Sequence, residues 1–262
     1  MGAFLQSLPV LIMKPDDLVE FSRQSYAKPE SIESWVEDSL VDSGLTTEER
    51  EILETFLPSR SGNLLLLGVG GGREAIPLAQ MGFQVTGVDY VAAMVDRARE
   101  NAARRGVRME GLVQEVSRLD VRESAYDIVW LSRAMYSCVP TRTRRVAMVR
   151  RIARALKPGG LLICQFSFRP GPPQPSRGGS GRRIIAASGL GNPAYESGDT
   201  LWLNVEFLHE FGSENAVRSE LEQGGLFVEQ LRTGQPGNRG SAVCRKRPET
   251  GQTSIMKKES ER

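Results

Sequence analysis

A glycine-rich turn followed at a fixed distance by an acid is the stretch of this sequence with the clearest chemical potential. The turn, Gly68-Val69-Gly70-Gly71-Gly72, follows the apolar run Leu64–Leu67, and Asp89 ends the next apolar run. Glycines let a ligand approach the backbone closely, and N–H groups at the head of a following helix hold a phosphate or a carboxylate. A carboxylate at Asp89 can accept two hydrogen bonds from ribose hydroxyls. These features predict a ligand that contains a nucleoside.

Three known loop motifs can be compared with this turn: the P-loop, the dinucleotide-binding fingerprint and the GxGxG loop. A P-loop is excluded, because no Lys-Ser or Lys-Thr follows the glycines. Counted from Gly70, "GGGREA" satisfies the GxGxxA fingerprint of dinucleotide-binding enzymes, with Asp89 about 20 residues further on. Counted from Gly68, the turn is a GxGxG loop, which suits a carboxylate as well as a phosphate. Both registers use Asp89, so later residues must decide.

Three later features favour the Gly68 register. Met94 lies five residues after Asp89, where a thioether can lie against a purine. "ALKPGG" (155–160) ends a predicted helix directly before a strand. "LVQEVSRLDVRESAYDIVWLS" places Glu115 at the end of one strand and opens the next at Tyr126. In order and spacing, these motifs resemble the class I S-adenosylmethionine-dependent methyltransferases over about residues 46–245.

The resemblance implies S-adenosyl-L-methionine as cofactor and assigns its contacts. In that family the glycine loop wraps the methionine half, the acid holds the ribose, and residues after it pack on adenine. For Met94 and Leu131, plain core packing is the alternative to a cofactor contact. The implied cofactor-binding residues are Gly68, Gly70 and Gly72 (loop), Asp89 (ribose), Tyr90 and Met94 (adenine), Glu115 and Val116 (exocyclic amine), and Leu131 and Ser132 (towards the acceptor).

One position departs from the family pattern. The family has an acid two residues before the first glycine, where it helps to hold the methionine ammonium, and here that position is Leu66. Weaker cofactor affinity or another partner for the ammonium would follow, so a non-catalytic cofactor-binding protein is an alternative. "LSRAMYSC" after the fourth strand lacks the Asn/Asp-Pro-Pro-aromatic tetrad of enzymes that methylate base amines.

Two residues are candidates for catalysis. Tyr136 lies just beyond the fourth strand and is expected to face the acceptor. His209 is the only histidine and could serve as a general base, with a structural hydrogen bond as the alternative. Four further aromatic residues could cap the pocket or simply pack: Tyr26, Trp35, Tyr195 and Trp202.

The elements that must position these residues follow a repeating strand–helix–strand (βαβ) pattern. Short apolar strands alternate with amphipathic helices from Asn63 onwards, which predicts an α/β, Rossmann-like, seven-stranded and mostly parallel sheet flanked by helices. The expected strands are 64–67, 84–88, 108–113, 126–131, 161–166, 201–207, 226–232 and 241–245. The expected helices are 16–40 (broken at Pro29), 46–57, 73–81, 91–105, 142–156 and 213–223.

The same rhythm divides the chain into segments. Residues 1–60 are expected to form an N-terminal helical cap, and 61–248 the cofactor-binding domain. Within that domain, 170–199 hold 12 Gly or Pro and are expected to be an irregular insert. Residues 249–262 are polar and are expected to be disordered.

The composition of the chain limits which partners we expect it to bind. The net charge is +2, with 12 acids against 5 bases in residues 1–60 and a basic remainder. The arginines of 142–154 accompany an apolar stripe without aromatic residues, so we expect a solvated face and no nucleic-acid partner. Three cysteines and one histidine predict a reducing, cytoplasmic location and no protein-bound metal. The apolar run 4–13 is too short to span a membrane.

The sequence therefore predicts a cytoplasmic enzyme that transfers a methyl group to an O, N, S or C atom of a small molecule. Its alternatives are a methyltransferase acting on RNA or protein, a non-catalytic binding protein, and a nicotinamide oxidoreductase. The acceptor atom, the need for a base and the oligomeric state are not predicted.

Overall fold

A computed structural model describes residues 8–57, 59–171, 192–203 and 205–248. Most of the predicted insert 170–199 and all of the predicted disordered tail 249–262 lie outside these ranges. In the described part of the chain, no helix has both the length and the apolar character needed to cross a bilayer.

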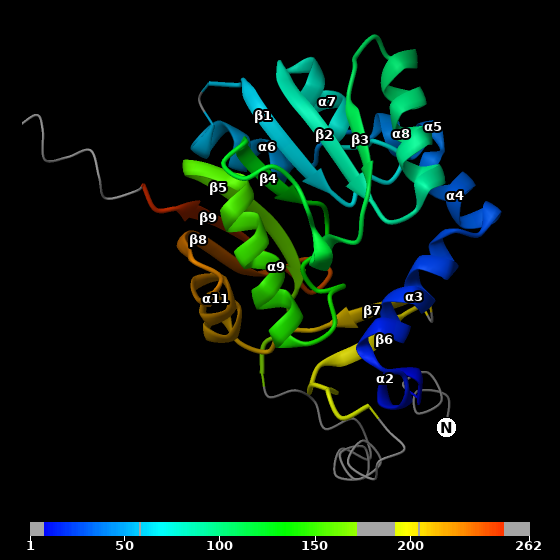
Figure 1. The fold of residues 1–262 in the computed structure, drawn as a ribbon, viewed down its shortest axis with the longest axis vertical. Coiled ribbons are helices and arrows are strands. Elements are labelled where there is room, and N and C mark those ends of the chain that lie inside the picture. Colours follow the sequence, from blue (N-terminus) through cyan, green and yellow to red (C-terminus); the bar gives the residue numbers. More distant parts are fainter. Residues whose placement is uncertain (1–7, 58, 172–191, 204, 249–262) are drawn as a thin grey trace, which may run out of the picture.

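A seven-stranded sheet in the order β3-β2-β1-β4-β5-β9-β8 forms the centre of the molecule (Figure 1). Strands β1 to β5 are parallel, and β9 pairs antiparallel with both β5 and β8. The predicted fold class is thus confirmed. The strands are β1 Gly62–Leu67, β2 Phe83–Asp89, β3 Glu110–Val113, β4 Tyr126–Leu131, β5 Leu156–Ser167, β8 Leu226–Gln235 and β9 Arg239–Lys246.

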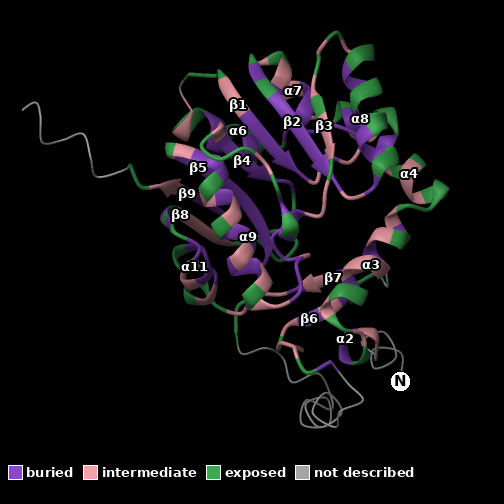
Figure 2. Cartoon of the chain, viewed as in Figure 1, coloured by how far each residue is buried: buried purple, intermediate pink, exposed green. Residues whose placement is uncertain are grey.

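Helices cover both faces of the sheet, because its central strands are apolar on both sides. In β1, Leu64 and Leu66 face one hydrophobic cluster, while Leu65 and Leu67 face the other. Helices α6, α7 and α8 pack in the first cluster, and α9 and α11 in the second. Buried residues accordingly run along the strands in Figure 2. The helices are α6 Thr47–Phe56, α7 Ala75–Gln80, α8 Ala92–Arg104, α9 Arg142–Ala155 and α11 Glu214–Gln223.

Helix α6 begins with a capping box formed by Thr46 and Glu49. The Thr46 N–H donates to Glu49 Oε2 (2.7 Å), and the Glu49 N–H donates to Thr46 Oγ1 (3.3 Å). This exchange satisfies two N–H groups that a helix start otherwise leaves without partners. Ile52 and Leu53 are then buried against the sheet. Although α6 lies within 1–60, it is part of the central core.

The predicted helix 16–40 is three helices: α3 Pro15–Tyr26, α4 Pro29–Val36 and α5 Asp38–Asp42. Prolines stand at the first position of α3 and α4, where the missing N–H costs nothing. A shorter helix, α2 Leu8–Ile12, precedes them.

The predicted strand 201–207 is wrong. The chain forms a hairpin instead, β6 Asp199–Trp202 and β7 Glu206–His209, in a two-stranded sheet of its own. It turns at Leu203, whose φ of 48° is left-handed, and the Val205 N–H donates to the Trp202 carbonyl (3.0 Å). In residues 203–207 apolar and polar residues alternate, as they do in a single strand, so the sequence pattern does not reveal the turn.

Other boundaries moved by a few residues. Strand β5 begins at Leu156 rather than 161, because Tyr126 pairs with Leu156 across an irregularity in the register. Helix α7 begins at Ala75 rather than 73, since the glycine turn extends further than expected.

The N-terminal helices pack on the β6–β7 hairpin. Val10, Leu11 and Leu18 form an apolar cluster with Leu201 and Phe207. In Figure 1, α2, α3 and the hairpin accordingly lie together at one end of the molecule, below α4. Segments about 190 residues apart in sequence thus form one structure beside the edge of the sheet.

Candidate functional site

The carboxyl ends of the three central strands meet at one edge of the sheet. Leu67 of β1 pairs with Val88 of β2 and with Leu131 of β4. The Ser132 N–H also donates to the Leu67 carbonyl (3.0 Å), which fixes the start of the loop after β4. The strand order reverses at β1, and such switch points are where open α/β sheets bind ligands.

The glycine turn after β1 needs its glycines for two different reasons. Gly68 (φ 85°) and Gly70 (φ 49°) have left-handed backbones, which other residues adopt at a cost. A Cβ on Gly71 would lie 2.3 Å from the carbonyl oxygen of Trp35, because α4 packs directly on the turn. A Cβ on Gly70 would meet only the Trp35 ring, at 4.0 Å. The turn therefore offers backbone to a ligand.

Asp89 closes the turn and keeps capacity for a ligand. Its Oδ2 accepts from the Gly70 N–H (3.1 Å) and its Oδ1 from the Val91 N–H (3.0 Å). Each carboxylate oxygen has two acceptor sites, so one site on each stays free for a hydroxyl. Burial raises the pKa of Asp89 to about 6, against the opposing effect of the backbone hydrogen bonds. This carboxylate is therefore held in a poorly solvated place at the cavity wall.

A cavity of about 470 Å³ begins at this edge and extends under α3, α4 and the hairpin. Ten cofactor-binding residues were predicted, and eight of them line it. Gly72 and Leu131 do not: Gly72 faces Ile76 and Ala98, and Leu131 is fully buried in the core. The eight are Gly68, Gly70, Asp89, Tyr90, Met94, Glu115, Val116 and Ser132.

Glu115 lines the cavity, but its carboxylate already has partners. It accepts from the backbone N–H of Ser117 (3.1 Å) and from the Ser117 hydroxyl. Arg118 (3.4 Å) and Arg144 (3.5 Å) pair with its other oxygen. These contacts cap the short helix Val116–Arg118. Its predicted contact with the exocyclic amine stays a prediction.

The cavity also holds an acid that the sequence analysis missed. The Tyr26 hydroxyl donates to Glu206 Oε2 (2.8 Å), and Cys138 lies beside the same carboxylate. Burial raises the pKa of Glu206, and burial followed by the charge of Glu206 raises that of the Cys138 thiol. Glu206 and Leu208 of β7 line the cavity together with Glu210, which directly follows the strand. In the sequence, the acid within the largely apolar segment "WLNVEFLHEF" was the signal that could have indicated this cavity residue.

Three arginines also line the cavity: Arg133, Arg169 and Arg239. Arg169 pairs with Glu210 (3.1 Å), and Arg239 donates to the Pro236 carbonyl (3.1 Å). The Arg133 guanidinium lies over the Trp35 ring, 5.6 Å from its centroid. The cavity wall thus contains both acids and cations in addition to the glycine turn.

Comparisons with known proteins agree with this geometry. Residues 64–160 match the family model described as "Methyltransferase domain". This part of the chain, under half of its length, is thus similar to a methyltransferase domain. The ubiquinone biosynthesis O-methyltransferase of Paramagnetospirillum magneticum is 38% identical over 106 residues, which are 40% of this chain and 41% of that protein. The chain thus aligns with about two fifths of the length of this relative.

Solved structures share the fold over more of the chain. The 1,6-didemethyltoxoflavin-N1-methyltransferase of Burkholderia thailandensis has a TM-score of 0.64 at 18% identity, over 90% of this chain and 92% of that one. A SAM-dependent methyltransferase from Methanosarcina mazei has a TM-score of 0.59 at 22% identity, over 79% of this chain and 100% of that one. At these identities the likeness shows the fold.

The methyltransferase domain has no acid at the position of Leu66, which is fully buried among core side chains. Glu74, just after the glycine turn, is the nearest substitute in sequence. It is buried, however, and its Oε1 is bonded to Arg73 and to the Ser132 hydroxyl. Arg73 is held in turn by Glu49 (2.9 Å). This cluster supports the turn from behind and does not line the cavity.

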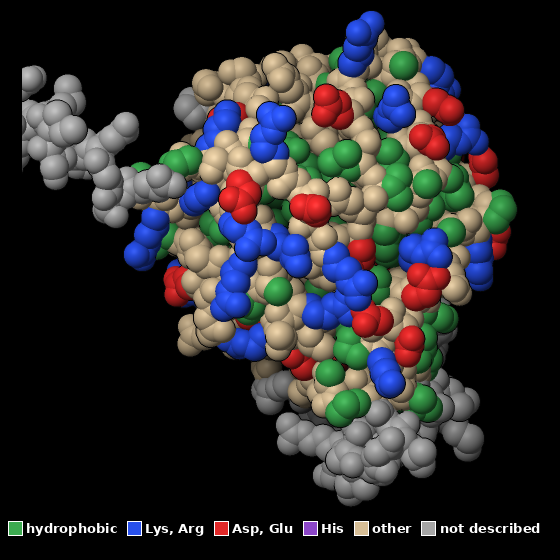
Figure 3. All heavy atoms as spheres, viewed as in Figure 1, with side chains coloured by type: hydrophobic (Ala, Val, Ile, Leu, Met, Phe, Trp, Pro, Cys, Tyr) green, Lys and Arg blue, Asp and Glu red, His purple; other side chains and the backbone are tan. Residues whose placement is uncertain are grey.

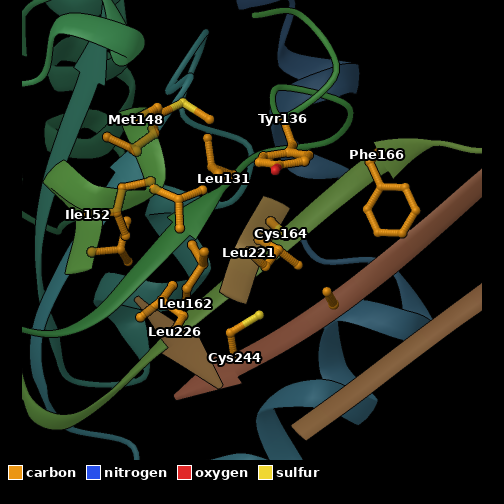
Figure 4. Close-up of a cluster of buried hydrophobic side chains, with 14 of the residues drawn as sticks. Leu131, Tyr136, Met148, Ile152, Leu162, Cys164, Phe166, Leu221, Leu226 and Cys244 are labelled. Atoms are coloured by element: carbon orange, nitrogen blue, oxygen red, sulfur yellow. The ribbon is translucent and has the colours of Figure 1, made fainter. Parts of the chain in front are cut away.

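Tyr136, predicted to face the acceptor, lies in the core of the domain. Its side chain is fully buried, and its hydroxyl donates to Glu220 Oε2 (2.9 Å). Its ring stacks on Phe211, with centroids 5.6 Å apart. Figure 4 shows it among the buried side chains of the sheet and α9, beside Leu131. The turn after β4 points this residue inwards, towards α11.

His209 also lies outside the cavity wall. Its Nδ1 is 2.8 Å from Asp199 Oδ1 and 3.8 Å from Glu196 Oε2, so that the three could hold a metal ion. Arg145 already pairs with Glu196 (2.8 Å) and lowers its pKa against the effect of burial. The placement matches the structural alternative for His209. Its side chain joins the two strands of the hairpin, and its backbone N–H donates to the Ser137 carbonyl (2.9 Å), which ties the hairpin to the segment after β4.

The arginines of α9 form a band across one face of the molecule (Figure 3). Arg144 pairs with Asp16 (3.0 Å) and Arg154 with Glu123 (3.5 Å), as in a solvated face. Arg145 is the exception to that prediction. It is 1% exposed and paired with Glu220 (2.8 Å), because it turns under the helix into the core.

Proposed function

We propose that this protein transfers a methyl group from S-adenosylmethionine to an O, N, S or C atom of a small-molecule acceptor in the cytoplasm. One observation carries the proposal: a single cavity joins the glycine turn and Asp89 to Glu206 and the arginines. A cavity that spans both groups can hold a cofactor and an acceptor in register. Such alignment contributes up to roughly 7–11 kcal/mol to catalysis in ideal cases.

The residues at the sheet edge fit the cofactor. The turn presents backbone where its amino-acid end would lie, and Asp89 has a free acceptor site on each oxygen for the two ribose hydroxyls. Tyr90 and Met94 provide apolar surface for the adenine. When bound, the cofactor supplies a methyl group that is already activated on a sulfonium. The protein's task is then to orient the acceptor and to exclude water.

Glu206 is the group that we assign to the acceptor. Glu206 lines the cavity, and burial raises the pKa of its carboxyl, which makes the carboxylate a stronger base. For a hydroxyl acceptor, Glu206 would take the hydroxyl proton, while the methyl–sulfur bond of the cofactor is replaced by a methyl–oxygen bond and S-adenosylhomocysteine is released. The Tyr26 hydrogen bond holds the carboxylate in place. Tyr136 and His209 have no part in this assignment.

A small acceptor suits the shape of the site. Helices α3 and α4 and the β6–β7 hairpin cover the cavity, with Ser22, Trp35 and Trp202 in its wall. An RNA or protein acceptor would need an open approach, and the charged band on α9 is largely ion-paired or bonded to backbone. We assign acceptor specificity to these covering elements. The three free cysteines support a reducing location.

A labelling experiment tests the proposal. The purified protein is incubated with cofactor carrying a labelled methyl group and with a cell extract, and the products are separated into small molecules, RNA and protein. We expect label in the small-molecule fraction, and none with Asp89→Ala. Label in RNA or protein, lost at raised salt, would support the macromolecular alternative. Cofactor binding without transfer to any fraction would indicate a non-catalytic protein.

A further inference from the structure

A turn in an unusual conformation places Arg133 beside the glycine loop. Ser132 and Arg133 directly follow β4, and Arg133 has a left-handed backbone (φ 43°), which a residue with a side chain rarely adopts. The Ser132 N–H is bonded to Leu67, and the Met135 N–H to the Ser132 carbonyl (3.0 Å), so contacts on both sides hold the turn. Such strain persists where the surroundings determine it, and it is common at ligand sites.

Trp35 and Met135 connect Arg133 to the glycine loop. Trp35 touches the loop, since a Cβ on Gly70 would lie 4.0 Å from its ring and one on Gly71 would meet its backbone. The Arg133 guanidinium lies over that same ring. The Met135 side chain packs against Gly68, where an added Cβ would lie 2.7 Å away. Arg133 therefore occupies the cavity at the loop, where the amino-acid end of the cofactor would lie.

The charge of Arg133 lacks a counterion. Arg73 is ion-paired with Glu49 and Glu74, and Arg169 with Glu210, but no carboxylate pairs with Arg133 among the residues that the structure describes. The Arg133 side chain is exposed, so an anion that enters the cavity can reach its guanidinium. The nearby positive charge of Arg73 adds to the attraction for an anion. A planar guanidinium also matches the two oxygens of a carboxylate.

Leu66 removes the usual way of holding the amino-acid end through its ammonium. We propose that Arg133 binds the carboxylate of that amino-acid end, so that this protein recognises it by its anionic rather than its cationic group. The inference rests on the proposed function, because it concerns the same cofactor. It makes Arg133 a cofactor-binding residue that neither the glycine motif nor the family pattern indicates.

The test compares two ligands by isothermal titration calorimetry. S-Adenosylhomocysteine carries the amino-acid end, whereas 5′-methylthioadenosine lacks it and keeps the adenosine. Arg133→Asn is the main variant, because asparagine tolerates a left-handed backbone. Arg133→Gly fits the same backbone and serves if the asparagine variant unfolds. Arg133→Lys keeps the charge without the fork, and Arg154→Asn makes the same charge change on exposed α9.

We expect Arg133→Asn to weaken S-adenosylhomocysteine binding by about tenfold to a hundredfold, the range for hydrogen bonds to charged groups. Its affinity for methylthioadenosine should be unchanged, Arg133→Lys should recover part of the loss, and Arg154→Asn should behave as wild type. Equal weakening for both ligands would show a structural role and overturn the inference. No weakening for either, with a higher acceptor KM, would assign Arg133 to the acceptor. A wild-type protein that binds neither ligand would contradict the proposed function itself.

Discussion

The Tyr26 hydroxyl donates a 2.8 Å hydrogen bond to Glu206 and so joins α3 to the β6–β7 hairpin across the cavity. The two residues are 180 positions apart in sequence. Their contact places Glu206 between two elements that also pack through Leu18 and Phe207. The covering elements therefore shape the acceptor site and hold its charged group.

Glu206→Gln should lower kcat about a hundredfold if the acceptor is a hydroxyl, as expected when a general base is removed. S-Adenosylhomocysteine affinity should change little, because Asp89 and the glycine turn keep their own hydrogen bonds in this variant. Tyr26→Phe is the matched variant. The Tyr26 hydrogen bond lowers the pKa of Glu206, so its loss should move the acidic limb of the kcat profile to higher pH. Full activity of Glu206→Gln with the physiological acceptor would contradict the assignment.

Asp89 should give the free protein an unusual pH dependence. Its pKa rises from 3.8 in the unfolded chain to about 6 in the folded protein. The folded protein therefore binds a proton between pH 6 and 4 that the unfolded chain does not, and this group stabilises the fold as the pH falls. The full effect is about 3 kcal/mol. Denaturant unfolding of wild type and Asp89→Asn at pH 4 to 7 measures it, and the difference in stability between the two should vary across that window.

The same protonation should oppose ligand binding. A neutral carboxyl offers fewer acceptor sites to the ribose, so S-adenosylhomocysteine affinity should fall about fivefold between pH 6 and pH 5. Asp89→Asn should bind more weakly and without this dependence. Equal slopes for the two proteins would place the titrating group elsewhere.

Gly71→Ala should disturb the site through α4. Its Cβ would meet the Trp35 carbonyl oxygen at 2.3 Å, so α4 must move away from the turn, and both Tm and S-adenosylhomocysteine affinity should fall. Gly106→Ala is the control, because Gly106 is left-handed (φ 75°) with open space around it. It should cost about 1–2 kcal/mol of stability and leave binding intact. Loss of binding in both variants would show general destabilisation instead.

Tyr136→Phe separates a core role from a catalytic one. The change keeps the ring on Phe211 and removes the hydrogen bond to Glu220, which retains Arg145. We expect a loss of about 1–2 kcal/mol in the free energy of unfolding, with kcat and cofactor affinity unchanged. A large drop in kcat in the folded variant would return Tyr136 to the active site.

The sequence predicted the sheet and the cofactor end well, because both depend on local patterns. Alternating apolar runs predict strands, and the glycine spacing with Asp89 predicts a turn and its closing acid. The acceptor end depends on contacts between distant segments. Glu206 acquires its place only when β7 folds against α3, and no spacing encodes that approach. Tyr136 was misplaced because one turn of unusual backbone after β4 decides whether a side chain faces the cavity or the core.

Calorimetric titration of the wild-type protein with S-adenosylhomocysteine and, separately, with NADH tests the central claim most directly. We predict binding of S-adenosylhomocysteine at one site per chain, abolished by Asp89→Ala in a protein that still unfolds cooperatively, and no binding of NADH. Binding of NADH alone, or of neither ligand, would contradict the account.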